Sequence, residues 1–219
     1  GVNGEINKQS TSALRTNNVQ TLTYFQDFDR HSVNVMVGHE YYKTTTKFLG
    51  AIAQGGFSPS IPEIDAFAKI SDASSYKSGY NVEGYFGSAQ YNYDQRYFAS
   101  ASFRRDASSY FAKENRWGNF WSVGGAWLIS KENFMQSSAS WLNMLKLKFS
   151  VGQQGNDNIG AYAYTDLYDL VPTGSTSMGA TFKRMGNPDI TWETTTNYNL
   201  GVEFSLWEGR LSGNVDYYV

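Results

Sequence analysis

Apolar and polar residues alternate with a period of two along the segment from Tyr85 to Arg104. Because successive side chains of a strand point to opposite faces, this pattern predicts two strands. The polar residues 94–96 between the two halves predict a tight turn, and therefore a β-hairpin. One face of this hairpin carries aromatic and small apolar residues: Tyr85, Gly87, Ala89, Tyr91, Tyr93, Tyr97, Ala99, Ala101 and Phe103. The other face carries mainly hydroxyl and amide side chains.

The same alternation recurs along the chain and predicts further strands at 21–28, 32–42, 121–129, 145–151, 197–206 and 211–219. The last two form a second hairpin around a turn at 207–210. Residues 1–19 are polar, with a short strand expected near 2–8. Gly, Pro, Ser, Asn and Asp are frequent in the segments 50–81, 106–119 and 152–190, which predicts three long irregular loops. The connector at 130–141 is expected to hold a short helical turn.

Two architectures show alternation of this kind, the half-buried sheet of a soluble β-sandwich and the wall of a transmembrane β-barrel. The connections separate them, because short turns at 27–31, 94–96 and 207–210 alternate with longer ones. Outer-membrane barrels have this asymmetry, with short turns at one rim and long loops at the other. Lys146 and Lys148, on the polar face of their strand, are costly in a dry core but solvated in a wet lumen. The pattern therefore favours an all-β, antiparallel transmembrane β-barrel.

Composition agrees with this choice and excludes several other classes of protein. The formal net charge of −2 provides no basic field for nucleic acid, and the absence of cysteine excludes disulfides, thiolate metal sites and cysteine nucleophiles. Aromatic residues make up 16% of the chain, which suits the girdles of a membrane barrel. Mean hydropathy is −0.47 and no long apolar run exists, so transmembrane helices are excluded. Residues 1–5 lack the features of a signal peptide, and with strand pattern at both ends we expect an internal piece of a longer polypeptide.

Motifs for catalysis or for cofactor binding are missing. His39-Glu40 begins like a zinc-protease helix, but the second histidine is absent and the segment reads as a strand. The triplet 156–158, Asn-Asp-Asn, offers oxygen ligands to calcium, although such a triplet after glycine is more often turn chemistry. The scattered carboxylates of the long loops form no recognisable glycosidase pair. We therefore expect no enzyme activity, no metal and no cofactor.

Several segments resemble one family closely. Residues 141–160, WLNMLKLKFSVGQQGNDNIG, resemble the block WLNNLKLRASYGQTGN of the SusC/RagA family of TonB-dependent outer-membrane transporters. Residues 102–109 (SFRRDASS), 115–120 (NRWGNF), 187–197 (NPDITWETTTN) and 211–218 (LSGNVDYY) are similar to further segments of that family, in the same order. Ala107, Tyr110 and Trp121 depart from the family pattern, which affects only the expected shape of the local loop.

The resemblance implies a plugged barrel of about 22 strands, of which residues 1–219 would supply about eight. The plug, the TonB box and the C-terminal strands would lie outside this chain. The implied function is TonB-dependent import of a large nutrient, an oligosaccharide or oligopeptide, across the outer membrane of a Gram-negative, Bacteroidota-type bacterium. The implied partners are a SusD-like surface lipoprotein, the TonB complex and outer-membrane lipid, with no nucleic acid. A passive porin or adhesin barrel and a soluble sugar-binding β-domain are the alternatives.

Substrate contacts in such a transporter come from loops and lumen-facing positions. The candidates are Arg116 and Trp117 in the 106–119 loop, and Asn156, Asp157, Asn158 and Tyr162 in the 152–190 loop. Trp117 offers a flat apolar face to a sugar ring or a peptide side chain, and the amides and the carboxylate offer hydrogen bonds. The alternative for each residue is that it only stabilises its own loop or contacts the SusD-like lipoprotein. The other tryptophans are expected in interfacial girdles.

Overall fold

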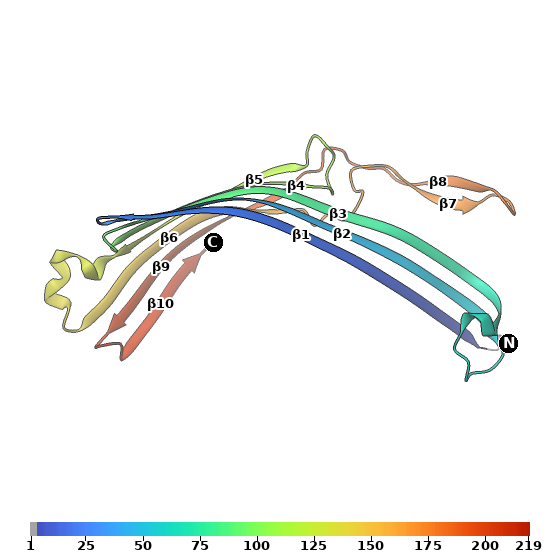
Figure 1. The fold of residues 1–219 in the computed structure, drawn as a ribbon, viewed down its shortest axis with the longest axis horizontal. Helices are drawn as coiled ribbons and strands as arrows, with labels where there is room; N and C mark the ends of the chain where they lie inside the picture. Colours follow the sequence, from blue (N-terminus) through green and yellow to red (C-terminus); the bar gives the residue numbers. More distant parts are fainter. Residues whose placement is uncertain (1–3) are drawn as a thin grey trace. The chain divides into compact units, whose positions relative to one another are not determined.

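The computed structural model describes residues 4–219, which form ten strands and three short 3-10 helices (Figure 1). The strands are β1 Glu5–Phe28, β2 His31–Gly56, β3 Phe67–Tyr93, β4 Tyr97–Ser108, β5 Trp117–Leu128, β6 Leu142–Asn156, β7 Leu167–Pro172, β8 Met178–Arg184, β9 Glu193–Leu206 and β10 Leu211–Tyr218. The helices are η1 Ile64–Ala66, η2 Ile129–Lys131 and η3 Asn133–Ser138. Among residues 4–219, no helix has the length and apolar character needed to cross a membrane.

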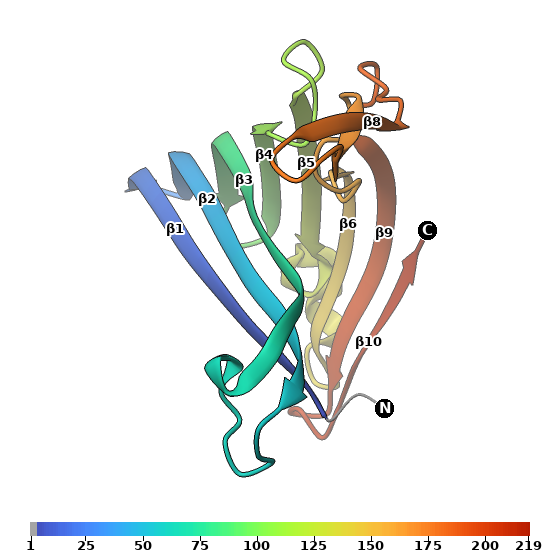
Figure 2. The same ribbon diagram turned by 90° about the vertical axis from the view of Figure 1, so that its right-hand side faces the viewer.

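Eight of these strands form one sheet in the order β1-β2-β3-β4-β5-β6-β9-β10, and β7 and β8 pair only with each other. Neighbouring strands are antiparallel, as the registers from β3 to β10 show. The predicted run of about eight antiparallel strands is thereby confirmed. β7 and β8 lie beyond the ends of β6 and β9, outside the main sheet (Figure 2).

The chain divides into two compact units, of which the first comprises the residues up to Asn17 together with Tyr41–Asn81. The prediction of an irregular stretch at 50–81 is wrong here, because β2 continues to Gly56 and β3 begins at Phe67. Of the short strand expected near 2–8, residues 5–8 belong to the long β1, Gly4 precedes it, and residues 2 and 3 lie outside the described residues. Most side chains of β1 and of this part of β3 are exposed. A strand with water on both faces needs no apolar alternation, so its Ser, Thr and Lys residues resemble a loop in the sequence.

The second unit comprises Asn18–Glu40 and Val82–Val219 and contains both predicted hairpins. Tyr93 pairs with Tyr97 across the first turn, and Leu206 pairs with Leu211 across the second. The 106–119 loop is shorter than predicted, since only residues 109–116 lie between β4 and β5. The 152–190 segment is not irregular throughout, because β6 extends to Asn156 and the segment contains β7 and β8. The predicted helical turn in the connector is confirmed by η2 and η3.

The sheet of the second unit has two chemically different faces, which we call the apolar face and the polar face. One cross-strand row, Leu147–Val202–Val215, shows the apolar face, and the adjacent row, Lys148–Gly201–Asp216, shows the polar face. The large side chains of the apolar face are exposed: Tyr85, Tyr91, Tyr97, Phe103, Trp117, Trp121, Val123, Phe149, Tyr198, Leu200, Val202, Leu211, Val215 and Tyr217. An exposed apolar face of this extent marks a surface made for contact with lipid or protein.

A row of aromatic rings crosses the apolar face at the end where the short turns lie. Its rings belong to Phe28, His31, Tyr93, Tyr97 and Trp127, and we call it the short-turn row. Centroids of successive rings lie 5.2, 5.0, 6.2 and 6.4 Å apart, which is the spacing of interacting aromatic pairs. Aromatic girdles of this kind mark the interface between a membrane and water.

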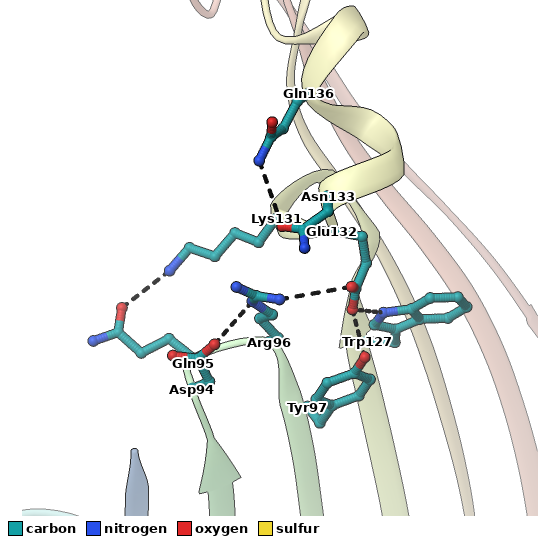
Figure 3. Close-up of polar contacts among 9 residues, drawn as sticks. All are labelled: Asp94, Gln95, Arg96, Tyr97, Trp127, Lys131, Glu132, Asn133 and Gln136. Atoms are coloured by element: carbon teal, nitrogen blue, oxygen red, sulfur yellow. Dashed lines mark hydrogen bonds and ion pairs between the residues drawn. The ribbon is translucent and has the colours of Figure 1, made fainter. Parts of the chain in front are cut away.

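The polar ends of this row are fixed by the connector between β5 and β6 (Figure 3). One carboxylate oxygen of Glu132 accepts hydrogen bonds from the Tyr97 hydroxyl at 2.5 Å and from Trp127 Nε1 at 3.0 Å. The other lies 3.7 Å from Arg96 Nη1, whose Nε in turn pairs with Asp94 at 3.0 Å. The Tyr97 hydroxyl, followed by Trp127 and Arg96, lowers the pKa of the Glu132 carboxyl below its ordinary value.

Acidification is therefore expected to loosen this connector. A depressed carboxyl pKa contributes stability above the ordinary value of about 4.3, and this stability is lost as the pH falls through the lower folded-state value. Hydrogen-exchange protection of residues 129–141, corrected for intrinsic exchange rates, should therefore fall in the wild type only at a pH below the ordinary carboxyl pKa. Glu132→Gln should show reduced protection already at neutral pH and little further change on acidification. Equal pH dependence in the two proteins would assign the effect to other groups.

Candidate functional site

Charged side chains on the polar face are paired across intervening glycines. The Arg104 guanidinium donates from Nη2 to Glu40 Oε2 at 2.8 Å and from Nε to Asp106 at 2.7 Å. The contact between Arg104 and Glu40 passes over β3 at Gly84, where a Cβ would overlap Asp106 and Arg104. Lys148 Nζ lies 3.5 Å from Asp216 Oδ1 in the same way, across Gly201 of β9. Glycine at these two positions gives the ion pairs the space that they need.

We call the end of the sheet that carries the connections 109–116 and 157–192 the long-loop end. At this end of the polar face, three aromatic rings form a compact cluster, which we call the rim cluster. It consists of Phe111, Phe120 and Trp192. The Trp192 ring lies 5.3 Å from Phe111 and 5.1 Å from Phe120, between centroids. Phe111 is fully buried, and Phe120 fits over Gly118 and Gly155, where a Cβ would overlap its ring. The rim cluster is thus an apolar core at this end of the polar face.

Hydrogen bonds join the two segments that carry the rim cluster, residues 109–116 and 187–192. Trp192 Nε1 donates to the Arg116 carbonyl at 2.8 Å, and Thr191 Oγ1 donates to the Asn115 carbonyl at 3.1 Å. Asn115 Nδ2 donates to the Pro188 carbonyl at 2.9 Å. Two connections that are far apart in sequence therefore form one packed unit at the end of the sheet.

Four of the six predicted site residues lie at this end of the sheet. Arg116 directly precedes β5, and its Nε is buried without a hydrogen-bond partner among residues 4–219. Asn156 ends β6; its Nδ2 donates to Glu193 Oε2 at 2.9 Å, and its Oδ1 accepts from the Asn158 amide at 3.0 Å. The Asp157 carbonyl accepts from the Ile159 amide at 2.8 Å. The triplet 156–158 therefore forms an Asx turn, as its composition suggests.

The other two predicted residues are placed differently. Trp117 was expected in a loop, and that expectation is wrong because β5 begins at this residue. Its ring lies on the apolar face, stacked on Tyr85 at 6.2 Å between centroids, since it pairs in register with Ala107. Tyr162 lies between β6 and β7 in a left-handed backbone conformation, with φ of 61° and an exposed side chain.

Sequence reasoning missed the rim cluster and the pairing of Asn156 with Glu193. Phe120 carried a detectable signal, because it occupies a polar-face position in the β5 alternation. A large aromatic residue at such a position indicates local packing. Among residues 4–219, no group of three or more His, Cys, Asp or Glu side chains is placed to hold a metal ion.

The β7–β8 hairpin rises from the same end and is amphipathic. Its register places the apolar residues Tyr168, Leu170, Pro172, Met178, Ala180 and Phe182 on one face. The opposite face carries the ion pair between Lys183 Nζ and Asp169 Oδ1 at 2.8 Å. The base of the hairpin is held by the Gly186 amide, which donates to Asp166 Oδ1 at 2.8 Å. The side chains of Leu170, Met178 and Phe182 are 71%, 62% and 58% exposed, so this apolar face is uncovered.

Comparison with known proteins places this two-faced sheet in a family. Residues 2–219 match the model of the family described as TonB dependent receptor-like, beta-barrel, and the chain belongs to that family. It is 35% identical to the TonB-dependent receptor SusC of Bacteroides thetaiotaomicron over 69% of this chain and 16% of SusC. It is 29% identical to the TonB-dependent receptor P26 of Formosa agariphila over 100% of this chain and 23% of that protein.

A solved structure described as the RagAB peptide transporter superimposes with a TM-score of 0.90 and 28% identity. The match covers 98% of this chain and 24% of that chain. The chain thus spans no more than about a quarter of the relatives that it matches. The predicted resemblance to SusC/RagA transporters is confirmed.

Proposed function

We propose that residues 1–219 form part of the barrel wall of an outer-membrane transporter that imports a large nutrient with energy supplied through TonB. The observation that carries this proposal is the exposed apolar face bounded by aromatic rows at both ends. The short-turn row lies at one end, and His39, Tyr85 and Trp117 form a second row, the long-loop row, with centroids 4.8 and 6.2 Å apart.

The separation of the two rows matches a membrane. Tyr97 belongs to the short-turn row, and Arg105 of the same strand pairs with Tyr85 of the long-loop row. The distance between these two positions along β4 is about 27 Å at about 3.4 Å per residue. A strand tilt of about 35–45° reduces this to a height of about 20 Å. Barrel walls carry an apolar band of about 25 Å between two aromatic girdles. The membership of the TonB-dependent receptor family supports the same placement.

The polar face is proposed to line the lumen, because its charges are paired and its amides and hydroxyls are suited to water. Substrate would meet the long-loop end of this face, where Arg116, Asn156, Asp157 and Asn158 lie beside the rim cluster. Tyr162 is retained as a candidate on the loop above them. Trp117 is no longer a candidate, because its ring lies on the apolar face, which this proposal places against lipid. The cargo would be an oligopeptide or an oligosaccharide, and the name of the RagAB peptide transporter favours the former.

The rest of the assembly is also part of the proposal. A plug, a TonB box and the remaining strands would belong to the full-length protein, since the relatives are about four times as long as this chain. A SusD-like surface lipoprotein would cover the long-loop end. The uncovered apolar face of the β7–β8 hairpin supports such a partner, because aromatic residues and methionine are enriched in protein interfaces.

Uptake by cells that produce the full-length protein tests this function. Replacing residues 167–184 by a short Gly-Ser linker, with Asp166 and Gly186 retained, should reduce uptake of the cognate nutrient while heat-modifiable barrel assembly stays intact. The control Glu208→Asn, in the turn at the opposite end of the sheet, should transport normally. Unchanged uptake in the hairpin variant, or hydrolysis of the nutrient by the purified protein, would contradict the proposal.

A further inference from the structure

Two adjacent arginines of β4 have opposite environments. The Arg104 guanidinium, on the polar face, is bonded to two carboxylates. Arg105 points to the apolar face, where its guanidinium carbon lies 5.1 Å from the centroid of the Trp117 ring. Among residues 4–219, no carboxylate lies within ion-pair distance of Arg105, and its side chain is exposed. A cation without a counter-ion on an apolar face is unusual and requires a partner.

The surroundings of Arg105 define what that partner can be. Asn119 lies directly opposite in the β4–β5 register, and both residues are exposed on the same face. The nearby carboxylate of Glu83 is already engaged, since its Oε1 accepts from the Tyr85 hydroxyl at 2.9 Å and lies 3.2 Å from His39 Nε2. One guanidinium and one amide are therefore free to donate at the same place.

The next pair of β4 and β5 residues on the same face is apolar. Phe103 pairs with Trp121, and these side chains are 52% and 41% exposed. The donors thus lie immediately beside an aromatic surface that is suited to hydrocarbon. A phosphorylated lipid presents the complementary arrangement, with an anionic headgroup above its acyl chains. Guanidinium binds phosphate in a forked, two-bond geometry that lysine does not reproduce.

We infer that Arg105 and Asn119 bind the phosphate of a lipid headgroup in the outer leaflet, with the acyl chains along Phe103 and Trp121. This inference rests on the proposed function, because it requires the apolar face to lie in the membrane. Trp117 supports the guanidinium from one side by a cation–π contact. The site would hold the barrel wall at a fixed depth at its long-loop end.

Native mass spectrometry of the full-length protein in nanodiscs tests this site. The probe is diphosphoryl lipid A in a phosphatidylcholine background, with dephosphorylated lipid A as the second arm. Arg105→Gln should reduce retention of the phosphorylated lipid about fivefold, the factor expected for one basic residue at an anionic membrane surface. Arg105→Lys should retain an intermediate amount. The control Arg210→Gln, in the turn at the opposite rim, should retain as much as the wild type.

Three outcomes would overturn the inference. Equal retention of lipid A by Arg105→Gln and the wild type would exclude the guanidinium as the binding group. Equal retention of phosphorylated and dephosphorylated lipid by the wild type would show that only the aromatic surface binds. Inorganic phosphate should not displace the lipid, and complete displacement would assign the site to a soluble anion instead. Failure to insert into nanodiscs would contradict the proposed function itself, whereas insertion with normal uptake and no effect of Arg105 would contradict this inference alone.

Discussion

Replacing Val202 by arginine in the full-length protein is expected to destabilise the assembled barrel by about 2–4 kcal/mol, the cost of a basic side chain near the middle of the bilayer. Val202 lies on the apolar face between Leu147 of β6 and Val215 of β10, away from the turn at 207–210. Its side chain is 37% exposed, so the longer arginine side chain would extend outward from this face. Urea unfolding in lipid vesicles measures the change directly.

Asn199→Arg is the matched control, because Asn199 lies on the polar face of the same strand. It faces the pocket of about 570 Å³ that also contains Lys148 and Asp216, where water and a carboxylate can accommodate a new cation. This variant should fold and unfold like the wild type. Similar destabilisation by both substitutions would mean that the two faces do not differ in solvent, and the assignment of lipid and lumen would be wrong.

The alternation of apolar and polar residues was sufficient to predict the strands that have one apolar and one polar face. The hairpins β3–β4 and β9–β10 follow the sequence closely, since one residue of slippage would move every aromatic side chain to the polar face. The turns were equally readable. Residues 94–95 and 207–209 adopt left-handed backbone conformations that suit the short polar connections at those points.

Prediction failed where a strand lacks alternation of apolar and polar residues. In the first unit, β2 and β3 run through segments such as Thr44–Thr46 and Ser74–Ser75, which have no apolar period. Their stability comes from the backbone ladder and from isolated pairs such as Phe48 and Tyr76, stacked at 5.0 Å. Such pairs depend on register between distant segments, which a single sequence does not reveal.

The same limit applies to the candidate site, where local turn chemistry could be predicted and contacts between distant segments could not. The turn at Asn156 and Asn158 could be predicted because its chemistry is local, whereas their contact with substrate stays a prediction. Trp117 was placed in a loop because polar residues precede it, although its spacing of four residues from Trp121 is compatible with the same face of a strand. The rim cluster was missed because Phe111 and Trp192 meet only after the chain has passed through four strands. Contacts of this kind are set by tertiary packing.

Trp192→Ala is expected to release the rim cluster and the two segments that it joins. Truncation of a packed aromatic side chain costs about 3–5 kcal/mol, and here it also removes the hydrogen bond from Nε1 to the Arg116 carbonyl. The loss should be local, because the strands remain paired through their ladders. Residues 109–116 should lose hydrogen-exchange protection and become sensitive to protease, and nutrient uptake should fall because Arg116 is no longer held in place.

Two further variants make this result specific. Trp192→Phe keeps a ring between Phe111 and Phe120 but cannot donate to Arg116, so it should lose only about 1 kcal/mol and retain most of the protection. Trp207→Ala, in the turn at the other end of the sheet, removes a side chain that is 52% exposed and should leave residues 109–116 unchanged. If Trp192→Ala keeps full protection of 109–116 yet abolishes uptake, the indole contacts substrate directly and does not act by fixing the rim. If protection is lost while uptake is unchanged, the packed segments serve only the stability of the wall, and substrate must enter past other residues.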